Sequence, residues 1–127
     1  MKNEIKIELP LKAVSLNQAY PTNKMGRRYL CQEGKSFKES VYYWIIGKCG
    51  YQPKEKDRFE VFITFHFKDN RRRDIDDYFK LLLDVFTDAH YWLDDSQIIS
   101  LWGRKFQGKE NKIEIKIKKY GKTLPTL

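Results

Sequence analysis

Residues 71–97 read RRRDIDDYFKLLLDVFTDAHYWLDDSQ, and this stretch holds the most informative pattern in the chain. It joins an arginine run at 71–73 to an acidic cluster at 74–77, an amphipathic helix and a second acidic pair at 94–95. Carboxylates at both ends of one helix, with cations at its head, suit a divalent-metal site that handles phosphate groups. The pattern is typical of a small metal-dependent nuclease.

The spacing of the first two acids, Asp74 and Asp76, restricts the backbone that can hold them. In a helix, side chains at i and i+2 diverge by about 200°, whereas in an extended segment they point to the same side. The cluster lies where a strand ending near Lys68 gives way to a helix. We therefore expect Asp74 to be non-helical, at or before the N-cap, with Asp76 in the first turn, so that the two carboxylates converge.

Further candidates for the site follow along the same helix. Lys80 lies four residues after Asp76, where it could orient that carboxylate or meet a phosphate. Asp94 and Asp95 follow the helix after a short turn and could close the site. Oxygen ligands alone favour Mg²⁺, with Mn²⁺ as a substitute. In the alternative interpretation these acids are an ordinary helix cap, a surface ion pair with Lys80 and a plain turn.

Length and composition limit the class of protein. With 127 residues, 41% of them hydrophobic, the chain can bury one core as a single domain. Its net charge of +8 favours a polyanionic partner. Cys31 and Cys49 have no metal-ligand spacing and indicate free thiols in a reducing compartment. No segment has the pattern of a signal peptide or a membrane span, so we expect a cytoplasmic protein with no membrane partner.

Hydrophobic periodicity predicts an α+β domain over residues 1–120, a mixed β-sheet with two α-helices packed on it, and a flexible tail over 121–127. The expected elements are strands over 3–9, 29–31 and 58–68, an extended segment over 12–16, a helix from Ser36 to Gly50, a central helix, and a hairpin of strands 98–106 and 112–120. The central helix should bury Ile75, Phe79, Leu82, Phe86 and Ala89. His66 falls on the polar face of its strand, where a structural or surface role is expected.

Basic side chains supply the candidate DNA contacts. The residues expected to meet phosphates are Arg71, Arg72, Arg73, Lys24, Arg27 and Arg28. Such contacts give affinity without reading base sequence. The alternative is a solvated basic face, and one of the three consecutive arginines could pair with a site aspartate instead.

The segment RRRDIDDYFKLLLDVFTDAHYWLDDSQII, residues 71–99, resembles the signature of the RusA family of Holliday junction resolvases, which are crossover junction endodeoxyribonucleases. That signature combines an arginine-rich run, D-[LI]-D-N, a lysine four residues after the second Asp, and W-L-D-D-x-Q-[VI]. Ser15-Leu16-Asn17 resembles the family's S-N-N stretch, and Arg27 with Glu33-Gly34 resembles its R-x-x-x-x-x-E-G segment. The resemblance covers about residues 3–118.

The resemblance implies an activity and a set of residues that perform it. It implies Asp74, Asp76 and Asp95 as metal-binding carboxylates, Lys80 as the basic residue that supports catalysis, Asp94 as a further candidate, and Asn17 among the DNA contacts. It also implies a homodimer that nicks four-way junctions symmetrically with Mg²⁺, in DNA recombination and repair. Members of the family are often encoded by phages or prophages.

Two departures from the family pattern bear on the site. Asp77 stands where the family has Asn, which adds a negative charge. His90 stands where relatives tend to have Gly, at a position expected to need a left-handed backbone. Two rival functions remain: a nuclease for other branched or flap DNA, and a non-catalytic DNA-binding module. Phe62 and Tyr42-Tyr43 mark two candidate dimer surfaces, between which the sequence does not choose.

Overall fold

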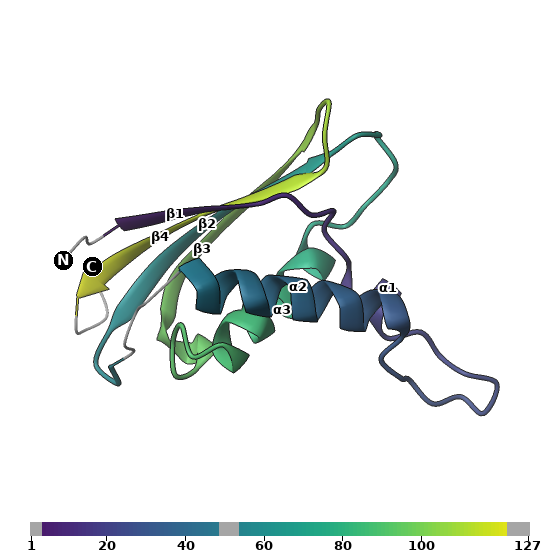
Figure 1. The fold of residues 1–127 in the computed structure, drawn as a ribbon, viewed down its shortest axis with the longest axis horizontal. Helices are drawn as coiled ribbons and strands as arrows, with labels where there is room; N and C mark the ends of the chain where they lie inside the picture. The colour runs from purple at the N-terminus through teal and green to yellow at the C-terminus, as the bar shows by residue number, and fades with distance from the viewer. Residues whose placement is uncertain (1–3, 49–53, 122–127) are drawn as a thin grey trace.

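The computed structural model describes residues 4–48 and 54–121, and it has the predicted α+β architecture (Figure 1). Along the chain the elements are β1 (Glu4–Leu9), α1 (Leu16–Ala19), α2 (Gln32–Lys48), β2 (Arg58–Phe67), α3 (Asp76–Asp88), the 3-10 helix η1 (Asp95–Gln97), β3 (Ile98–Gln107) and β4 (Lys112–Gly121). The strand expected over 58–68 and the central helix are confirmed.

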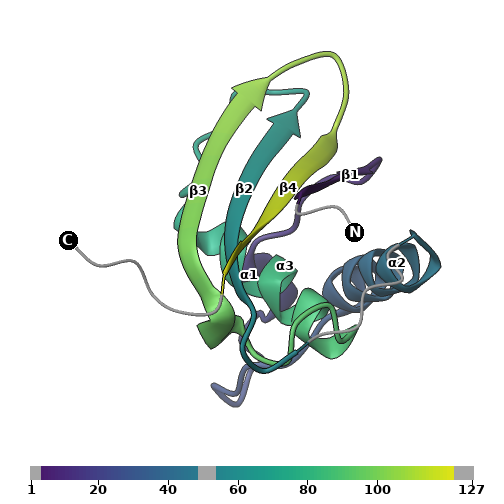
Figure 2. The ribbon, with the colours of Figure 1, turned by 90° about the vertical axis from the view of Figure 1, so that its left-hand side faces the viewer.

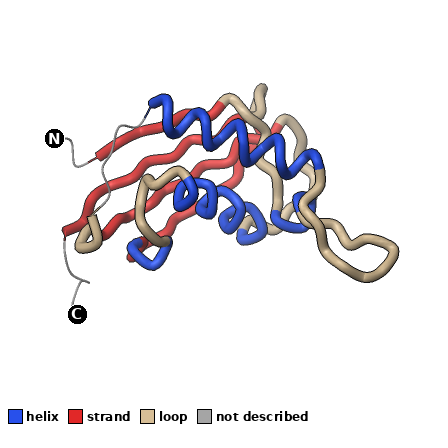
Figure 3. Tube along the Cα trace, turned by 60° about the horizontal axis from the view of Figure 1, so that its bottom comes forward, coloured by secondary structure: helices blue, strands red, loops and turns tan. Residues whose placement is uncertain are grey.

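The four strands form one mixed sheet in the order β1-β4-β2-β3. Strand β4 is antiparallel to both β1 and β2, whereas β2 is parallel to β3. Ile115 of β4 lies between Ile7 of β1 and Ile63 of β2, and all three side chains are buried. The helices cover this buried face, and the opposite face of the sheet carries no helix among the described residues (Figures 2 and 3).

The predicted hairpin of β3 and β4 is wrong. These strands lie on opposite sides of β2, so residues 108–111 cross its end. Gly108 N donates to Phe67 O at 2.8 Å and Lys68 N donates to Asn111 Oδ1 at 3.0 Å, which fixes this crossing. The burial pattern explains the placement. Residues 101–107 are all exposed, as on an edge strand, whereas the three isoleucines of β4 are buried as in a central strand.

Helix α3 packs against both the sheet and α2, which widens its buried face. Leu82 and Phe86 are buried as predicted. Ile75, Phe79 and Ala89 are only partly buried. The buried set also includes Tyr78, Leu81, Leu83 and Val85, because a helix covered on two sides needs more than one narrow apolar stripe.

The N-terminal connections differ from those expected. Leu16 was expected in an extended segment but begins the one-turn helix α1, which the sequence analysis missed. Ser15 N donates to Gln18 Oε1 at 3.0 Å and Gln18 N donates to Ser15 Oγ at 3.1 Å, forming a capping box. Helix α2 begins at Gln32 and not at Ser36, whose hydroxyl accepts from Gln32 Nε2 at 3.1 Å within the helix.

Residues 29–31 form no strand; the pairing nearby is an isolated bridge between Thr22 and Arg28. The predicted helix end at Gly50 and the second cysteine, Cys49, lie outside the described residues, as do residues 122–127 of the expected tail. Cys31 is a free, partly buried thiol. Within the described residues, no helix has the length and apolar content that a membrane crossing requires.

Candidate active site

The head of α3 has the backbone that the acid spacing predicts. Asp74 is non-helical and Asp76 begins the helix, which confirms the expectation for both. Asp77 N donates to Asp74 O at 3.1 Å, so the first turn closes on the peptide of Asp74. The side chains of Asp74 and Asp76 are exposed. Both carboxylates are therefore accessible at the end of the helix where the peptide dipoles attract negative charge.

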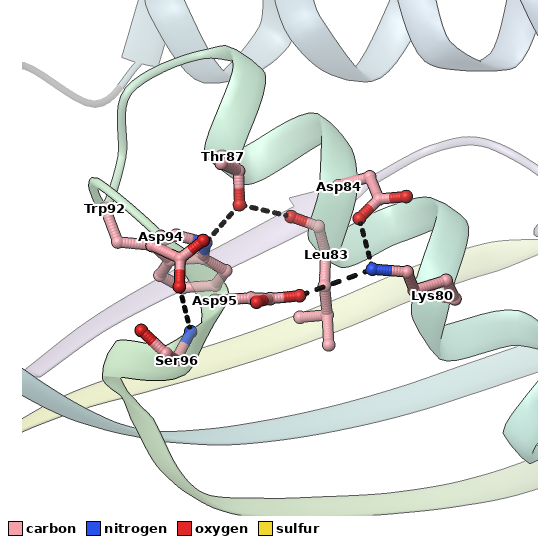
Figure 4. A network of polar contacts seen from close by, with 8 residues as sticks. All are labelled: Lys80, Leu83, Asp84, Thr87, Trp92, Asp94, Asp95 and Ser96. Atoms are coloured by element: carbon pink, nitrogen blue, oxygen red, sulfur yellow. Dashed lines mark hydrogen bonds and ion pairs between the residues drawn. The ribbon is translucent and has the colours of Figure 1, made fainter.

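The local spacing suggested that Lys80 pairs with Asp76, but the structure pairs it with two other acids. Its Nζ lies 3.0 Å from Asp84 Oδ1, one turn further along α3, and 3.4 Å from Asp95 Oδ2 in η1 (Figure 4). The Asp84 carboxylate, and to a smaller extent Asp95, raises the pKa of Lys80 above its ordinary value. Lys80 is therefore a cation that joins α3 to the acidic pair that follows it.

The two acids of that pair have different roles. The carboxylate of Asp94 accepts from Ser96 N at 3.0 Å and caps η1, and this hydrogen bonding lowers the pKa of Asp94. Asp95 turns toward Lys80 instead (Figure 4). Asp95 also lines a hollow of about 280 Å³ beside the start of β3. The plain-turn interpretation thus describes Asp94, while Asp95 faces the candidate site.

Gln97 holds η1 in place, and the sequence analysis did not single it out. Its side chain is buried and lies at the end of η1. Oε1 accepts from Leu93 N at 2.7 Å, while Nε2 donates to Lys54 O at 2.8 Å and to Asp57 O at 3.0 Å. One amide therefore ties the loop before η1 to the segment that leads into β2. The Gln of the W-L-D-D-x-Q pattern was the signal available in the sequence.

The loop between α3 and η1 is anchored rather than free. Trp92 is fully buried, stacks on Phe86 with ring centroids 5.2 Å apart, and donates from Nε1 to Thr87 Oγ1 at 2.8 Å. His90 has a φ of 58°, which confirms the left-handed position expected there. His90 N donates to Thr87 O and Tyr91 N to Phe86 O, both at 3.0 Å, which is a Schellman ending.

Arg73 is less accessible than the other two arginines of its run, and its assignment as a DNA contact stays a prediction. Its side chain is 8% exposed, donates to Asp69 Oδ1 at 2.8 Å and lies 3.9 Å from the centroid of the Phe67 ring. The hydrogen bond from Arg73 lowers the pKa of Asp69. The carbonyl of Arg73 accepts from Lys105 of β3. Arg73 therefore fixes the backbone immediately before Asp74, and its partner is Asp69 rather than a site aspartate.

The other predicted DNA contacts are exposed. Arg71 and Arg72 lie beside the head of α3, and Lys24 and Arg27 lie in the loop that projects beyond α1 between residues 20 and 31 (Figure 1). In that loop Arg28 donates from Nη2 to Asn17 Oδ1 at 3.3 Å, so these two predicted contacts are linked to each other. The structure leaves all of these groups accessible to a polyanion.

The carboxylates do not form a closed cage. Among residues 4–48 and 54–121, no three His, Cys, Asp or Glu side chains lie close enough to share one ion. Aspartate oxygens are ligands that Mg²⁺ prefers. The carboxylate of Asp95, however, is paired with Lys80 and is not grouped with Asp74 and Asp76. The assignment of Asp74, Asp76 and Asp95 as ligands of one ion stays a prediction.

Comparison with known proteins relates the whole arrangement to one group of enzymes. A family model described as endodeoxyribonuclease RusA matches residues 10–118. Crossover junction endodeoxyribonuclease rusA of Enterobacteria phage 82 is 34% identical over 86 residues, covering 65% of this chain and 68% of the phage protein. RusA of Escherichia coli strain K12 is 33% identical over 86 residues, which again cover 65% of this chain and 68% of the relative. RusA of Escherichia coli O139:H28 is 29% identical over 109 residues, 83% of this chain and 88% of that protein.

These matches place the chain in the class of enzymes that cut within DNA strands. Within that class it belongs to the RusA family of endodeoxyribonucleases.

Proposed function

We propose that the protein is a Mg²⁺-dependent endonuclease that resolves four-way DNA junctions by paired, symmetric cuts. Membership of the RusA family supports the reaction class, and relatives carry the name crossover junction endodeoxyribonuclease. One observation carries the proposal: Lys80 Nζ lies 3.4 Å from Asp95 Oδ2, which joins the helix that begins at Asp76 to the acidic pair that follows it. The activity would serve DNA recombination and repair in the cytoplasm of a cell or of a phage-infected host.

The proposed reaction is hydrolysis of a phosphodiester. The oxygen of one water molecule bonds to phosphorus, the bond from phosphorus to the 3′ oxygen breaks, and that oxygen takes up a proton. The products are a 5′-phosphate and a 3′-hydroxyl. Asp74, Asp76 and Asp95 are the residues that would hold a divalent ion, and the ion would supply Lewis acidity for the attack of water.

The chain's own residues bind and orient the phosphate in this proposal. The ammonium of Lys80, which is protonated at neutral pH, offsets negative charge on the phosphate as the bond breaks. Arg71, Arg72 and the loop that carries Lys24 and Arg27 hold the flanking phosphates. These contacts predict a steep dependence of binding on salt and none on base sequence.

We propose a homodimer joined through the uncovered face of the sheet. Phe62 and Trp102 stack there with ring centroids 6.3 Å apart, and Lys116 Nζ lies 4.9 Å from the Phe62 ring. Trp102 is 62% exposed and borders a hollow of about 590 Å³ on this face. His66 lies on the same face, 2.5 Å from Glu114 Oε1, which fits the structural role expected for it.

The charges of this face suit a second copy of the chain better than DNA. Strand register and alternation place on it the basic residues Lys6, Arg58, Arg104, Lys112, Lys116 and Lys118, with the acidic residues Glu4, Glu8, Glu60 and Glu114. The face thus accounts for only +2 of the net charge of +8, and leaves most of the basic charge elsewhere. A face that carries both signs can complement itself about a two-fold axis, which also matches the symmetry of a four-way junction.

The dimer surface is tested by sedimentation of two matched variants. Trp102→Glu should yield a monomer, whereas Tyr43→Glu, on the other exposed aromatic surface, should leave the dimer intact. Tyr43 is 66% exposed, so the two substitutions place a charge on comparably open aromatic residues. If Tyr43→Glu dissociates the dimer and Trp102→Glu does not, the dimer interface lies on α2 and the proposed interface is wrong.

The activity is tested with a synthetic immobile junction, a linear duplex and a flap, each with and without Mg²⁺. Symmetric cutting of the junction supports the proposal, equal cutting of the flap supports a broader branch nuclease, and binding without cutting supports a non-catalytic module. Asp76→Asn should abolish cutting and preserve junction binding, because it removes a candidate ligand and leaves the basic surface. Asp88→Asn, an exposed acid on the same helix, is the control and should cut normally.

A further inference from the structure

Met25 lies in the turn of the loop at residues 20–31, which projects beyond α1 (Figure 1). Its side chain is 84% exposed, more than any other large hydrophobic side chain that the structure describes. One exposed apolar side chain is ordinary on a protein surface. Met25 is distinguished by the backbone that carries it and by the charges beside it.

Hydrogen bonds fix the turn around Met25. Asn23 Oδ1 accepts from Met25 N at 2.9 Å and from Arg27 N at 3.0 Å. Asn23 N donates to Arg27 O at 2.8 Å, and Gly26 N donates to Asn23 O at 3.0 Å. Gly26 has a φ of 81°, which glycine adopts without strain. The turn is therefore held in one conformation before a partner binds, which lowers the entropic cost of binding through it.

The base of the loop is tied to the body of the protein. Thr22 and Arg28 form a β-bridge across it, and Tyr29 N donates to Pro21 O at 3.1 Å. Arg28 Nε also donates to Tyr20 O at 3.0 Å, beside the end of α1. The turn is thus supported at a distance from the sheet and the long helices, where it can reach a part of a partner that they do not contact.

The charge of the loop selects an anionic partner. Residues 20–31 contain three cations, Lys24, Arg27 and Arg28, and no acidic residue. Lys24 and Arg27 are exposed and flank Met25 in the sequence. A partner that takes this turn therefore presents anionic groups next to an apolar contact. The phosphates and the stacked bases of a nucleic acid supply both.

A membrane with anionic lipids also supplies both features, but the loop suits it less well. Even one myristoyl chain gives only marginal membrane binding, and a methionine side chain is much smaller. A side chain that enters a base stack, by contrast, adds to an affinity that phosphate contacts already provide. Membership of a family of endodeoxyribonucleases favours DNA as the partner.

We infer that Met25 determines specificity for branched DNA by inserting between bases at the branch point, while Lys24 and Arg27 contact the adjoining phosphates. The inference rests on the proposed function, in which the substrate is a four-way junction. Opening a base step in a continuous duplex costs its full stacking energy, whereas bases whose pairing or stacking is already interrupted open at lower cost. Met25 thereby favours a branch point over linear DNA, which the phosphate contacts alone do not distinguish.

The experiment follows 2-aminopurine, a base whose fluorescence rises on unstacking, placed at the branch point of a synthetic immobile junction. Binding of the full chain in EDTA, which prevents metal-dependent cutting, should raise the fluorescence. Met25→Gln keeps the length of the side chain and makes it polar. This change should remove most of the rise and weaken junction binding by about 10-fold, less than burial of a whole apolar side chain supplies, because unstacking opposes the gain. Met25→Leu keeps an apolar side chain and should retain both properties.

The matched control is Lys24→Gln, which alters the neighbouring side chain of the same turn. It should reduce the slope of log Kd against log salt concentration by about 1 and leave the fluorescence rise in place. On a linear duplex that carries the same base, Met25→Gln should bind within about 2-fold of the unsubstituted chain, because the phosphate contacts are unchanged.

Three results would overturn the inference. The unsubstituted chain could bind the junction without a rise in fluorescence, in which case the proposed function stands and the role of Met25 falls. Met25→Gln could keep the full rise, or could weaken binding to duplex and junction equally. Met25-dependent binding to vesicles of phosphatidylglycerol, with no fluorescence change on the junction, would assign the turn to a lipid surface instead. A chain that binds the junction no more tightly than the duplex would contradict the proposed function as well.

Discussion

Replacing Gln97 with Met should loosen the connection between η1 and the sheet without changing side-chain size greatly. Gln97 is 5% exposed, and its amide satisfies backbone groups on both sides of the site. Met fills a similar volume but can neither donate to Lys54 O and Asp57 O nor accept from Leu93 N. The change therefore isolates the hydrogen bonds from the packing.

The expected cost follows from which partners water can reach. Lys54 is exposed, so its carbonyl can bond to solvent once Gln97 is gone. The bond to Asp57 O is buried, but that oxygen also accepts from Arg58 Nη1 at 2.9 Å and keeps this partner, whereas the partly buried Leu93 N would lose its bond to Gln97. A buried polar group left unsatisfied costs about 1–3 kcal/mol, so Gln97→Met should lower the free energy of unfolding by about 2 kcal/mol.

Urea denaturation followed by tryptophan fluorescence measures this loss, with an unchanged m-value showing that the unfolding reaction is the same. Gln107→Met is the control: Gln107 is exposed on β3, so its substitution should change stability by less than about 0.5 kcal/mol. A loss below about 1 kcal/mol for Gln97→Met would refute the reasoning, because the loop carrying Asp95 would then be held by other contacts.

Three other substitutions test separate parts of the structure. Arg73→Met should lower the free energy of unfolding, measured by urea denaturation, by about 1–2 kcal/mol. Arg72→Met is the control: it should leave the free energy of unfolding unchanged and should reduce the salt dependence of junction binding. His90→Gly should raise the free energy of unfolding by about 0.5–1 kcal/mol, because glycine adopts the left-handed backbone without strain, and thermal unfolding measures the gain. Gly103→Ala would place a Cβ 2.1 Å from Cζ of Phe79, so it should cost about 1–3 kcal/mol by the same assay.

The backbone at the head of α3 could be predicted from the sequence because its causes are local. The spacing of Asp74 and Asp76, and the change of period from strand to helix, determine where α3 begins. The alternation in β2 likewise determines which of its side chains are buried, and Phe59 through Phe67 follow it. In both cases the information lies within a few residues of the feature itself.

The partner of Lys80 could not be predicted in this way. Asp76 and Asp84 both lie one turn from it, and the order acid-then-lysine favours Asp76 on an isolated helix. The structure instead brings Asp95 beside the following turn, through contacts made by Gln97 and Trp92. That arrangement depends on packing between distant segments, which no local rule contains. The same limitation explains the misplaced hairpin, because the choice between β2 and β4 as neighbours of β3 is made across the whole sheet.

Residues 68–97 form the link between β2 and β3, two strands that lie side by side in one sheet. The candidate acids at 74–95 thus lie on a segment whose two ends are held in the sheet, whereas the projecting loop at 20–31 belongs to a different part of the chain. In the proposed function, insertions or exchanges in that loop would alter the contacts with DNA while the candidate acids between residues 74 and 95 keep their places. The fold in this way lets specificity diverge in evolution independently of the reaction itself.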